Sequence, residues 1–164
     1  MFRYLFRKIE EFLLPERQIN GTGYLEPLDA VRLIYYRISQ LAEQIESHAE
    51  LAPYPQAAER LRRIAGEKRD IANRLKQIIE ALHGPITEKE LRLPVTGKNH
   101  WQRLVRDLED QRKLDDLLSR YEFSVTRQFP QIGAFFGGLK IVHEAHRRAL
   151  AQLSAVADPQ ATQT

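Results

Sequence analysis

The chain has no cysteine, so it can form no disulfide, thiolate metal site or cysteine nucleophile. It also has no apolar run close to the roughly 20 residues needed to cross a bilayer. Basic residues are not in large excess: 25 Lys and Arg stand against 22 Asp and Glu, a net charge of +3. These absences leave histidine and carboxylate as the available metal ligands and argue against membrane and nucleic-acid partners. We expect a cytoplasmic protein.

Prolines and glycines divide the chain, and apolar residues recur between them every three or four positions, which predicts four long helices. β-branched residues do not alternate with polar ones, so the sequence predicts no strand. With 164 residues and mostly short links, we expect one all-α, antiparallel four-helix bundle. The expected organisation is an N-terminal amphipathic helix at 1–14, a linker at 15–26, the bundle at 27–157 and a polar tail at 158–164.

The N-terminal segment has one apolar face and an opposite face of mixed charge. It can pack on its own bundle, dock on another subunit or lie in a membrane interface. Because its charges are mixed rather than strongly basic, membrane contact is the least expected of the three. We therefore expect a homo-oligomer or a protein partner, with the contact made by Phe2, Leu5, Phe6, Ile9, Phe12 and Leu13.

Lys68 occupies a position on the apolar stripe of the second long helix, where a cation needs a partner. The other members of that stripe are Leu61, Ile64, Ile71, Leu75, Ile78 and Leu82. The third and fourth helices also become polar near mid-length, and His48 on the first helix belongs to a layer nearer the first turn. Counting back from each turn predicts one buried polar layer of Lys68, Gln111, Asp115, His143 and His146.

Two chemistries compete for this layer. The first is an ion pair between Lys68 and Asp115, extended by Gln111 and the histidines. The second is a metal site, because imidazole and carboxylate groups from different helices can converge inside a bundle. Its ligands would be His143, His146, Asp115 and, from the flank, Glu67. The ammonium of Lys68 argues against a metal site, because it repels a metal ion and cannot act as a ligand while it is protonated.

Glycines interrupt the start of the fourth helix at Gly133, Gly137 and Gly138, each at a cost of roughly 1 kcal/mol relative to alanine. They predict a bend or a close helix contact, with a ligand approaching the backbone as the alternative.

The second helix, from Ile64 to Leu75 (IAGEKRDIANRL), resembles a helix of the ferritin-like superfamily, particularly of rubrerythrin- and bacterioferritin-type bundles. In that family a Glu-x-x-His pair follows an Ile-Ala step, and in phase the pair falls here on Lys68 and Ile71. The fourth helix resembles the family's second such pair, with His146 at the histidine and His143 at the glutamate. The resemblance implies a ferritin-like bundle in which the di-metal ligands have degenerated.

The resulting expectation is a non-enzymatic bundle subunit for protein–protein interaction or assembly, without a cofactor. The alternative is a ferritin-like metalloprotein that binds iron or zinc in a reduced site, with oxidoreductase or iron-storage activity. A third class is a bundle in which His143 or His146 ligates haem. The sequence shows no phosphate-binding loop and no nucleophile constellation. It therefore favours a protein without enzymatic activity, without deciding the point.

Overall fold

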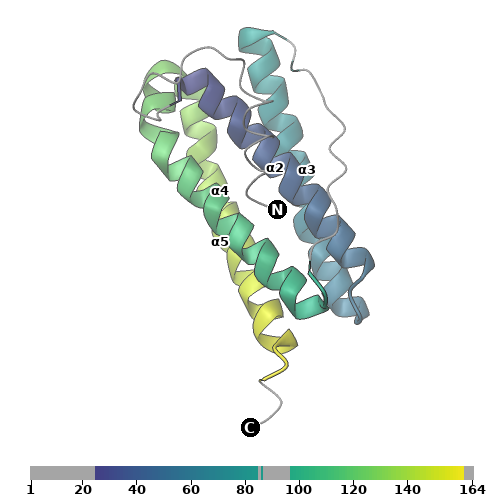
Figure 1. The fold of residues 1–164 in the computed structure, drawn as a ribbon. Helices are drawn as coiled ribbons and strands as arrows, with labels where there is room; N and C mark the ends of the chain where they lie inside the picture. The colour runs from purple at the N-terminus through teal and green to yellow at the C-terminus, as the bar shows by residue number, and fades with distance from the viewer. Residues whose placement is uncertain (1–24, 85, 87–96, 161–164) are drawn as a thin grey trace.

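The computed structural model describes residues 25–84, 86 and 97–160, and these form four α-helices and no strand. They are α2 (Pro27–Glu50), α3 (Pro55–His83), α4 (His100–Gln128) and α5 (Pro130–Ala157), shown in Figure 1. The prediction of an all-helical bundle of four helices is confirmed. The amphipathic helix expected at 1–14, most of the linker and the last residues of the tail lie outside the described residues.

Local sequence signals define the helix ends. Three of the helices, α2, α3 and α5, begin with proline in their first turn, where a missing N–H has no cost. The fourth, α4, is capped by Asn99, whose Oδ1 accepts from the backbone N of Gln102 at 2.8 Å. Gly84 follows α3 with φ 83°, a conformation that favours glycine.

Contacts along the helices define their directions. The start of α2 lies beside the end of α4, where the N–H of Leu25 donates to Tyr121 Oη at 3.1 Å. The start of α3 lies beside the end of α5, where Arg60 donates to Gln152 at 2.9 Å. Each helix therefore runs opposite to the neighbours it packs on, and α3 and α4 run in the same direction (Figure 1). The end of α3 and the start of α4 consequently lie at opposite ends of the bundle.

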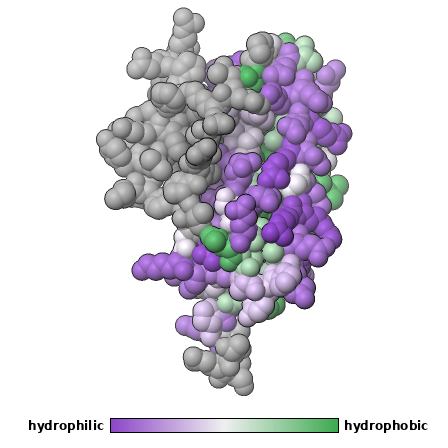
Figure 2. Space-filling model, turned by 90° about the vertical axis from the view of Figure 1, so that its right-hand side faces the viewer, coloured by the Kyte–Doolittle hydropathy of each residue, from purple (hydrophilic) through white to green (hydrophobic). Residues whose placement is uncertain are grey.

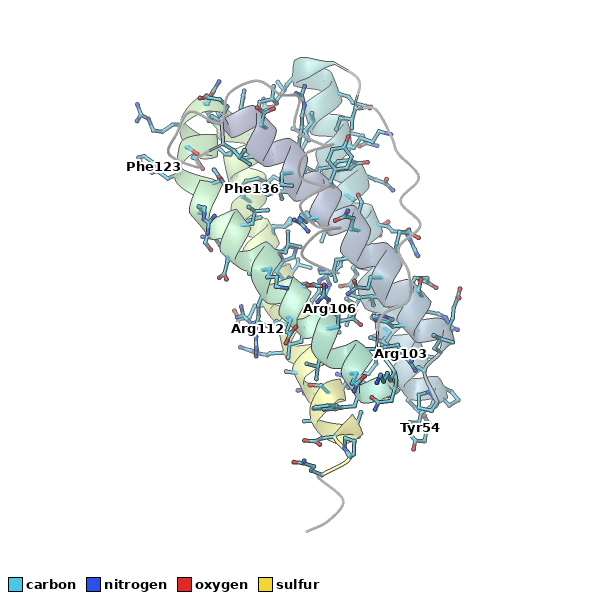
Figure 3. All side chains as sticks on the ribbon, viewed as in Figure 1. Tyr54, Arg103, Arg106, Arg112, Phe123 and Phe136 are labelled. Atoms are coloured by element: carbon cyan, nitrogen blue, oxygen red, sulfur yellow. The ribbon has the colours of Figure 1, made fainter. Side chains whose placement is uncertain are left out.

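The core is mostly aliphatic, and Ile34, Ile38 and Ile45 on α2 are fully buried in the same cluster as Leu61 and Leu118. Figure 3 shows Phe136 between the helices near one end of the bundle, whereas Phe123 points away from it. On the face drawn in Figure 2, most of the described surface is hydrophilic, with scattered apolar residues. Among the four helix pairs that pack on one another, the contact between α3 and α5 is the least extensive.

The expected core stripes need correction on two helices. On α3 the prediction that Leu82 is buried is wrong, because it is 44% exposed. Ile71 and Ile78 are only half-buried, and the inward positions are taken by Ala72, Leu75 and Ile79. A second correction applies to α5. Spacing of three and four residues from Ile132 predicts that Phe135 and Val142 are buried, but both are half-buried, whereas Phe136 and His143 are buried. Both shifts occur on α3 and α5. Their mutual contact is the thinnest of the four packing pairs, so it constrains the apolar pattern of either helix only weakly.

The three glycines of α5 differ in what surrounds them. A Cβ on Gly133 would lie 2.7 Å from Thr126 Cα, so this glycine permits the close approach of α4 and α5. A Cβ on Gly137 or Gly138 would meet nothing within 4 Å. The close helix contact predicted for this region is therefore found at Gly133.

Candidate functional site

The five residues expected at mid-bundle come from three helices and lie at one level of the bundle. We call Lys68, Gln111, Asp115, His143 and His146 the central polar layer. Lys68 and Gln111 are fully buried, the two histidines are 1% and 2% exposed, and Asp115 is half-buried.

Lys68 is the buried amine of this layer. Its Nζ donates to Gln111 Oε1 at 2.5 Å, and Gln111 Nε2 donates in turn to Asp115 Oδ1 at 2.8 Å. The expected direct ion pair between Lys68 and Asp115 is thus replaced by a bridge through an amide. Burial lowers the pKa of Lys68 to about 7, against the opposing charges of Asp115, Asp107 and Glu67.

Asp115 is the carboxylate that holds the layer together on the α4 side. His143 Nδ1 lies 3.0 Å from Asp115 Oδ1, and Arg147 donates to Oδ2 at 3.2 Å. Burial opposes ionisation of Asp115, but the hydrogen bonds from His143 and Gln111 outweigh it. The pKa of Asp115 therefore lies below its usual value. This carboxylate is an anion with several donors around it.

His146 is bonded to a different carboxylate, on α3. Its Nε2 lies 2.7 Å from Glu67 Oε2, and the Glu67 side chain is 50% exposed. Burial lowers the pKa of His146 to about 4, and the charge of Lys68 acts in the same direction, against the hydrogen bond to Glu67. Burial is likewise the largest cause that lowers the pKa of His143. Both rings are therefore neutral near pH 7.

The hydrogen-bond partners fix the tautomers of these two neutral rings. An ionised carboxylate only accepts, so the hydrogen lies on His143 Nδ1 and on His146 Nε2. Within the described part of the chain, the opposite atoms, His143 Nε2 and His146 Nδ1, are buried without a partner. The layer thus presents two imidazole lone pairs on rings whose centroids are 6.2 Å apart.

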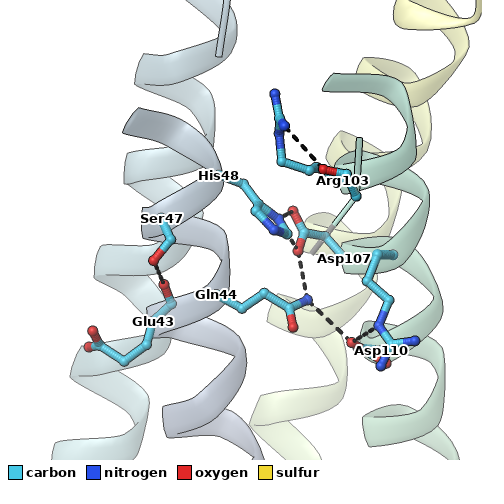
Figure 4. Close-up of polar contacts among 9 residues, drawn as sticks. Glu43, Gln44, Ser47, His48, Arg103, Asp107 and Asp110 are labelled. Carbon is cyan, nitrogen blue, oxygen red and sulfur yellow. Dashed lines mark hydrogen bonds and ion pairs between the residues drawn. The ribbon is translucent and has the colours of Figure 1, made fainter. Parts of the chain in front are cut away.

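A second buried cluster joins α2 and α4 nearer the α2–α3 turn (Figure 4). His48 Nδ1 lies 2.8 and 2.9 Å from the two oxygens of Asp107, and both side chains are fully buried. Gln44 Nε2 bridges Asp107 and Asp110 at 2.8 and 3.2 Å. Burial raises the pKa of Asp107, against the hydrogen bond from His48.

Sequence reasoning placed His48 on the inward stripe of α2 but missed its partner Asp107. Asp107 lies three residues after Leu104 and four before Gln111, on the inward face of α4, but its charge is typical of a solvated position. The available signal was His48 itself, because a buried imidazole at the end of α2 requires a partner on the facing helix. The start of α4 is that facing segment.

The described residues do not provide the ligands of a di-metal centre. Lys68 and Ile71 stand where the resemblance places one Glu-x-x-His pair. No group of three His, Cys, Asp or Glu side chains among the described residues has a metal-binding arrangement. Of the proposed ligands His143, His146, Asp115 and Glu67, the structure forms two separate imidazole–carboxylate pairs. The layer can transfer protons among its members or bind a small polar group.

Comparisons of the chain with protein-family models, curated proteins and solved structures found no significant match. The fold and site therefore define the class directly: an all-α four-helix protein with an ionisable layer across its core. Among the described residues, no helix is both long and apolar enough to cross a membrane.

Proposed function

We propose that this chain is a non-enzymatic, ferritin-like bundle subunit for protein–protein interaction or assembly. In this proposal a buried polar layer replaces the di-metal site. The observation that carries it is Lys68: a fully buried amine at mid-core, bonded to Gln111, occupies the space where the resemblance places a metal-binding glutamate. An amine with its own hydrogen-bond network fills that space without a metal.

The course of the chain supports the ferritin-like part of the proposal. Bundles of that type have one long crossover connection. Here the consecutive helices α3 and α4 run in the same direction, with residues 84–99 between them, whereas the other two connections are short.

The interaction part is supported by apolar side chains at the surface of the described bundle. Tyr54, Phe123 and Val156 are each at least 65% exposed. The partner is a second copy or another protein. The N-terminal segment contributes either by contacting that partner or by completing the bundle surface that the partner recognises.

Two measurements on the full-length chain test this proposal. Light scattering over a range of protein concentrations should give a mass above 19.1 kDa, the mass of one chain. Elemental analysis after expression in iron- and zinc-replete medium should give far less than one metal per chain. A chain that stays monomeric at all concentrations contradicts homo-oligomerisation, and a stoichiometric metal contradicts the replaced site.

A metalloprotein with a reduced site is the second candidate, and one observation favours it. His143 and His146 each donate the N–H of one ring nitrogen to a carboxylate and leave the other nitrogen without a partner among the described residues, as metal-binding histidines do. Iron or zinc would then be held by these two nitrogens and further ligands. More than about half a metal per chain, lost in His146→Gln but kept in His48→Gln, would favour this candidate.

A further inference from the structure

The described residues cover the apolar face along the contact between α3 and α5 only in part. We call this face the α3–α5 seam, defined by Ile71, Ile78 and Leu82 on α3 and Phe135, Gly138 and Ile141 on α5. Ile141 is 75% and Leu82 is 44% exposed, and the other four are not fully buried. Arg74 lies 5.9 Å from the Phe135 ring, which shows that the two rows of side chains lie at the same level.

Gly138 adds a separate indication that something packs on this seam. Glycine inside a helix costs roughly 1 kcal/mol relative to alanine. A Cβ at Gly138 would meet nothing within 4 Å, so packing inside the described bundle does not require the glycine. A helix that approached the seam closely would require it.

The sequence provides a segment that matches this seam in length and polarity. Residues 2–13 carry six large apolar side chains on one helical face. A helix of 14 residues is about 21 Å long. On α5, the distance from Phe135 to His146 is 11 residues, or about 16 Å. A helix of 14 residues is therefore long enough to cover the seam over this part of α5.

The attachment point lies within reach of the seam. The described chain begins at Leu25, which is bonded to Tyr121 near the end of α4, the end of the bundle where α5 begins. Residues 15–24 form a tether of at most about 33 Å, which exceeds the width of two helices, about 20 to 24 Å. A short tether also raises the local concentration of the segment to about the millimolar range, which favours its own bundle over a second copy.

The charged residues of the segment are consistent with one direction along the seam. A segment that enters from this end places its residue 14 near the tether and its residue 1 farther down α5. Glu10 and Glu11 then lie at the level of Arg74, and Arg3 and Arg7 lie lower, beside the exposed Asp70 and half-exposed Glu67. Opposite charges therefore meet at both levels.

We infer that residues 2–13 pack as a fifth helix in the α3–α5 seam of their own chain. This goes beyond the proposed function.

Engineered cysteine pairs test the placement, because the chain has no cysteine of its own. We expect Ile9→Cys with Ile141→Cys to be joined within one chain by a short bismaleimide reagent. The matched control is Ile9→Cys with Val156→Cys, since Val156 is 84% exposed and lies about 22 Å farther along α5. Cross-linked dimers alone would overturn docking on the same chain, and equal reaction of both pairs would overturn docking in the seam.

Hydrogen exchange provides a second, independent readout in the full chain. We expect Ile141→Asp to speed amide exchange of residues 2–13 at least tenfold, and Val156→Asp to leave it unchanged. Both positions are exposed in the described bundle, so neither change should unfold it. Exchange that is already fast in the unaltered chain would overturn the inference without bearing on metal content or oligomer mass, which test the proposed function.

Discussion

Lys68 is the residue whose replacement gives the clearest test of the central polar layer. Lys68→Ala leaves Gln111 Oε1 without its donor and opens a cavity, and we expect a loss of about 3 kcal/mol in the free energy of unfolding. Lys68→Met also leaves Gln111 Oε1 without its donor, but it fills the space and removes the desolvation cost of the buried amine. We therefore expect its stability to lie within about 1 kcal/mol of that of the unaltered chain. Urea unfolding followed by circular dichroism measures both. Equal losses in the two variants would contradict a packing role for Lys68.

The lowered pKa of Lys68 predicts how stability depends on alkaline pH. In the folded chain the pKa is about 7 and in the unfolded chain it is near 10.5, so between these values the unfolded state binds more protons. The penalty for burying the ammonium is complete below pH 7 and disappears as the pH rises towards 10.5. We expect the unaltered chain to gain stability relative to Lys68→Met over this range. A difference that is constant with pH would contradict the lowered pKa.

The lowered pKa of His146 predicts how stability depends on acidic pH. Its pKa is about 4 in the folded chain, below the ordinary 6.5, so between these values the unfolded state binds more protons. Stability is retained above pH 6.5 and falls as the pH drops towards 4. We expect this fall to be shallower in His146→Gln than in the unaltered chain, as measured by urea unfolding at each pH. Titration of the His146 ring signals by NMR near pH 6.5 would contradict the prediction.

At the scale of single residues, the sequence predicted which side chains meet better than how they bond. Lys68 was recognised because an amine interrupts an otherwise apolar stripe. The bridge through Gln111 was not, since an amide can serve either neighbour and only the rotamer decides. Asp107 was missed because its burial depends on His48, 59 positions away in sequence.

At the scale of helices, the glycines of α5 give a matched pair of substitutions. Gly133→Ala places a Cβ 2.7 Å from the backbone of Thr126, so α4 and α5 must separate, and we expect a loss of about 2 kcal/mol. Gly137→Ala meets nothing within 4 Å and should raise stability by about 1 kcal/mol through helix propensity. Thermal or urea unfolding of the two variants decides, and effects of the same sign would contradict this account of Gly133.

The helices themselves were largely predictable, because proline starts three of them and a glycine follows α3. Their inward phase was predictable only where a neighbour packs closely. On α2, which contacts both α3 and α4 extensively, the apolar residues spaced three and four apart from Val31 to Ile45 are buried. On α3 the stripe deviates beyond Lys68, since the thin contact with α5 does not force Ile71, Ile78 and Leu82 inward.

At the scale of the whole molecule, periodicity identifies four inward faces but not which helices are neighbours. Consecutive α3 and α4 are parallel and not extensively packed on each other, and the contacts that establish this join residues far apart in sequence, such as Arg60 with Gln152. Such pairings depend on side-chain complementarity across the bundle, which one sequence does not reveal. Among the four helix pairs that pack on one another, α3 and α5 have the thinnest contact.

Removal of residues 1–14 tests whether that thin contact is part of the finished molecule. Burial of six large apolar side chains yields roughly 9 to 18 kcal/mol in gross terms, and ordering about a dozen residues opposes it with a similar amount. We therefore expect the deletion to lower the free energy of unfolding by about 1 to 3 kcal/mol. If the segment packs on its own bundle, the mass by light scattering stays as in the full chain, whereas docking on a second copy predicts that the mass falls as well. Unchanged stability together with unchanged mass would contradict both arrangements, because the six apolar side chains would then have no site on either bundle.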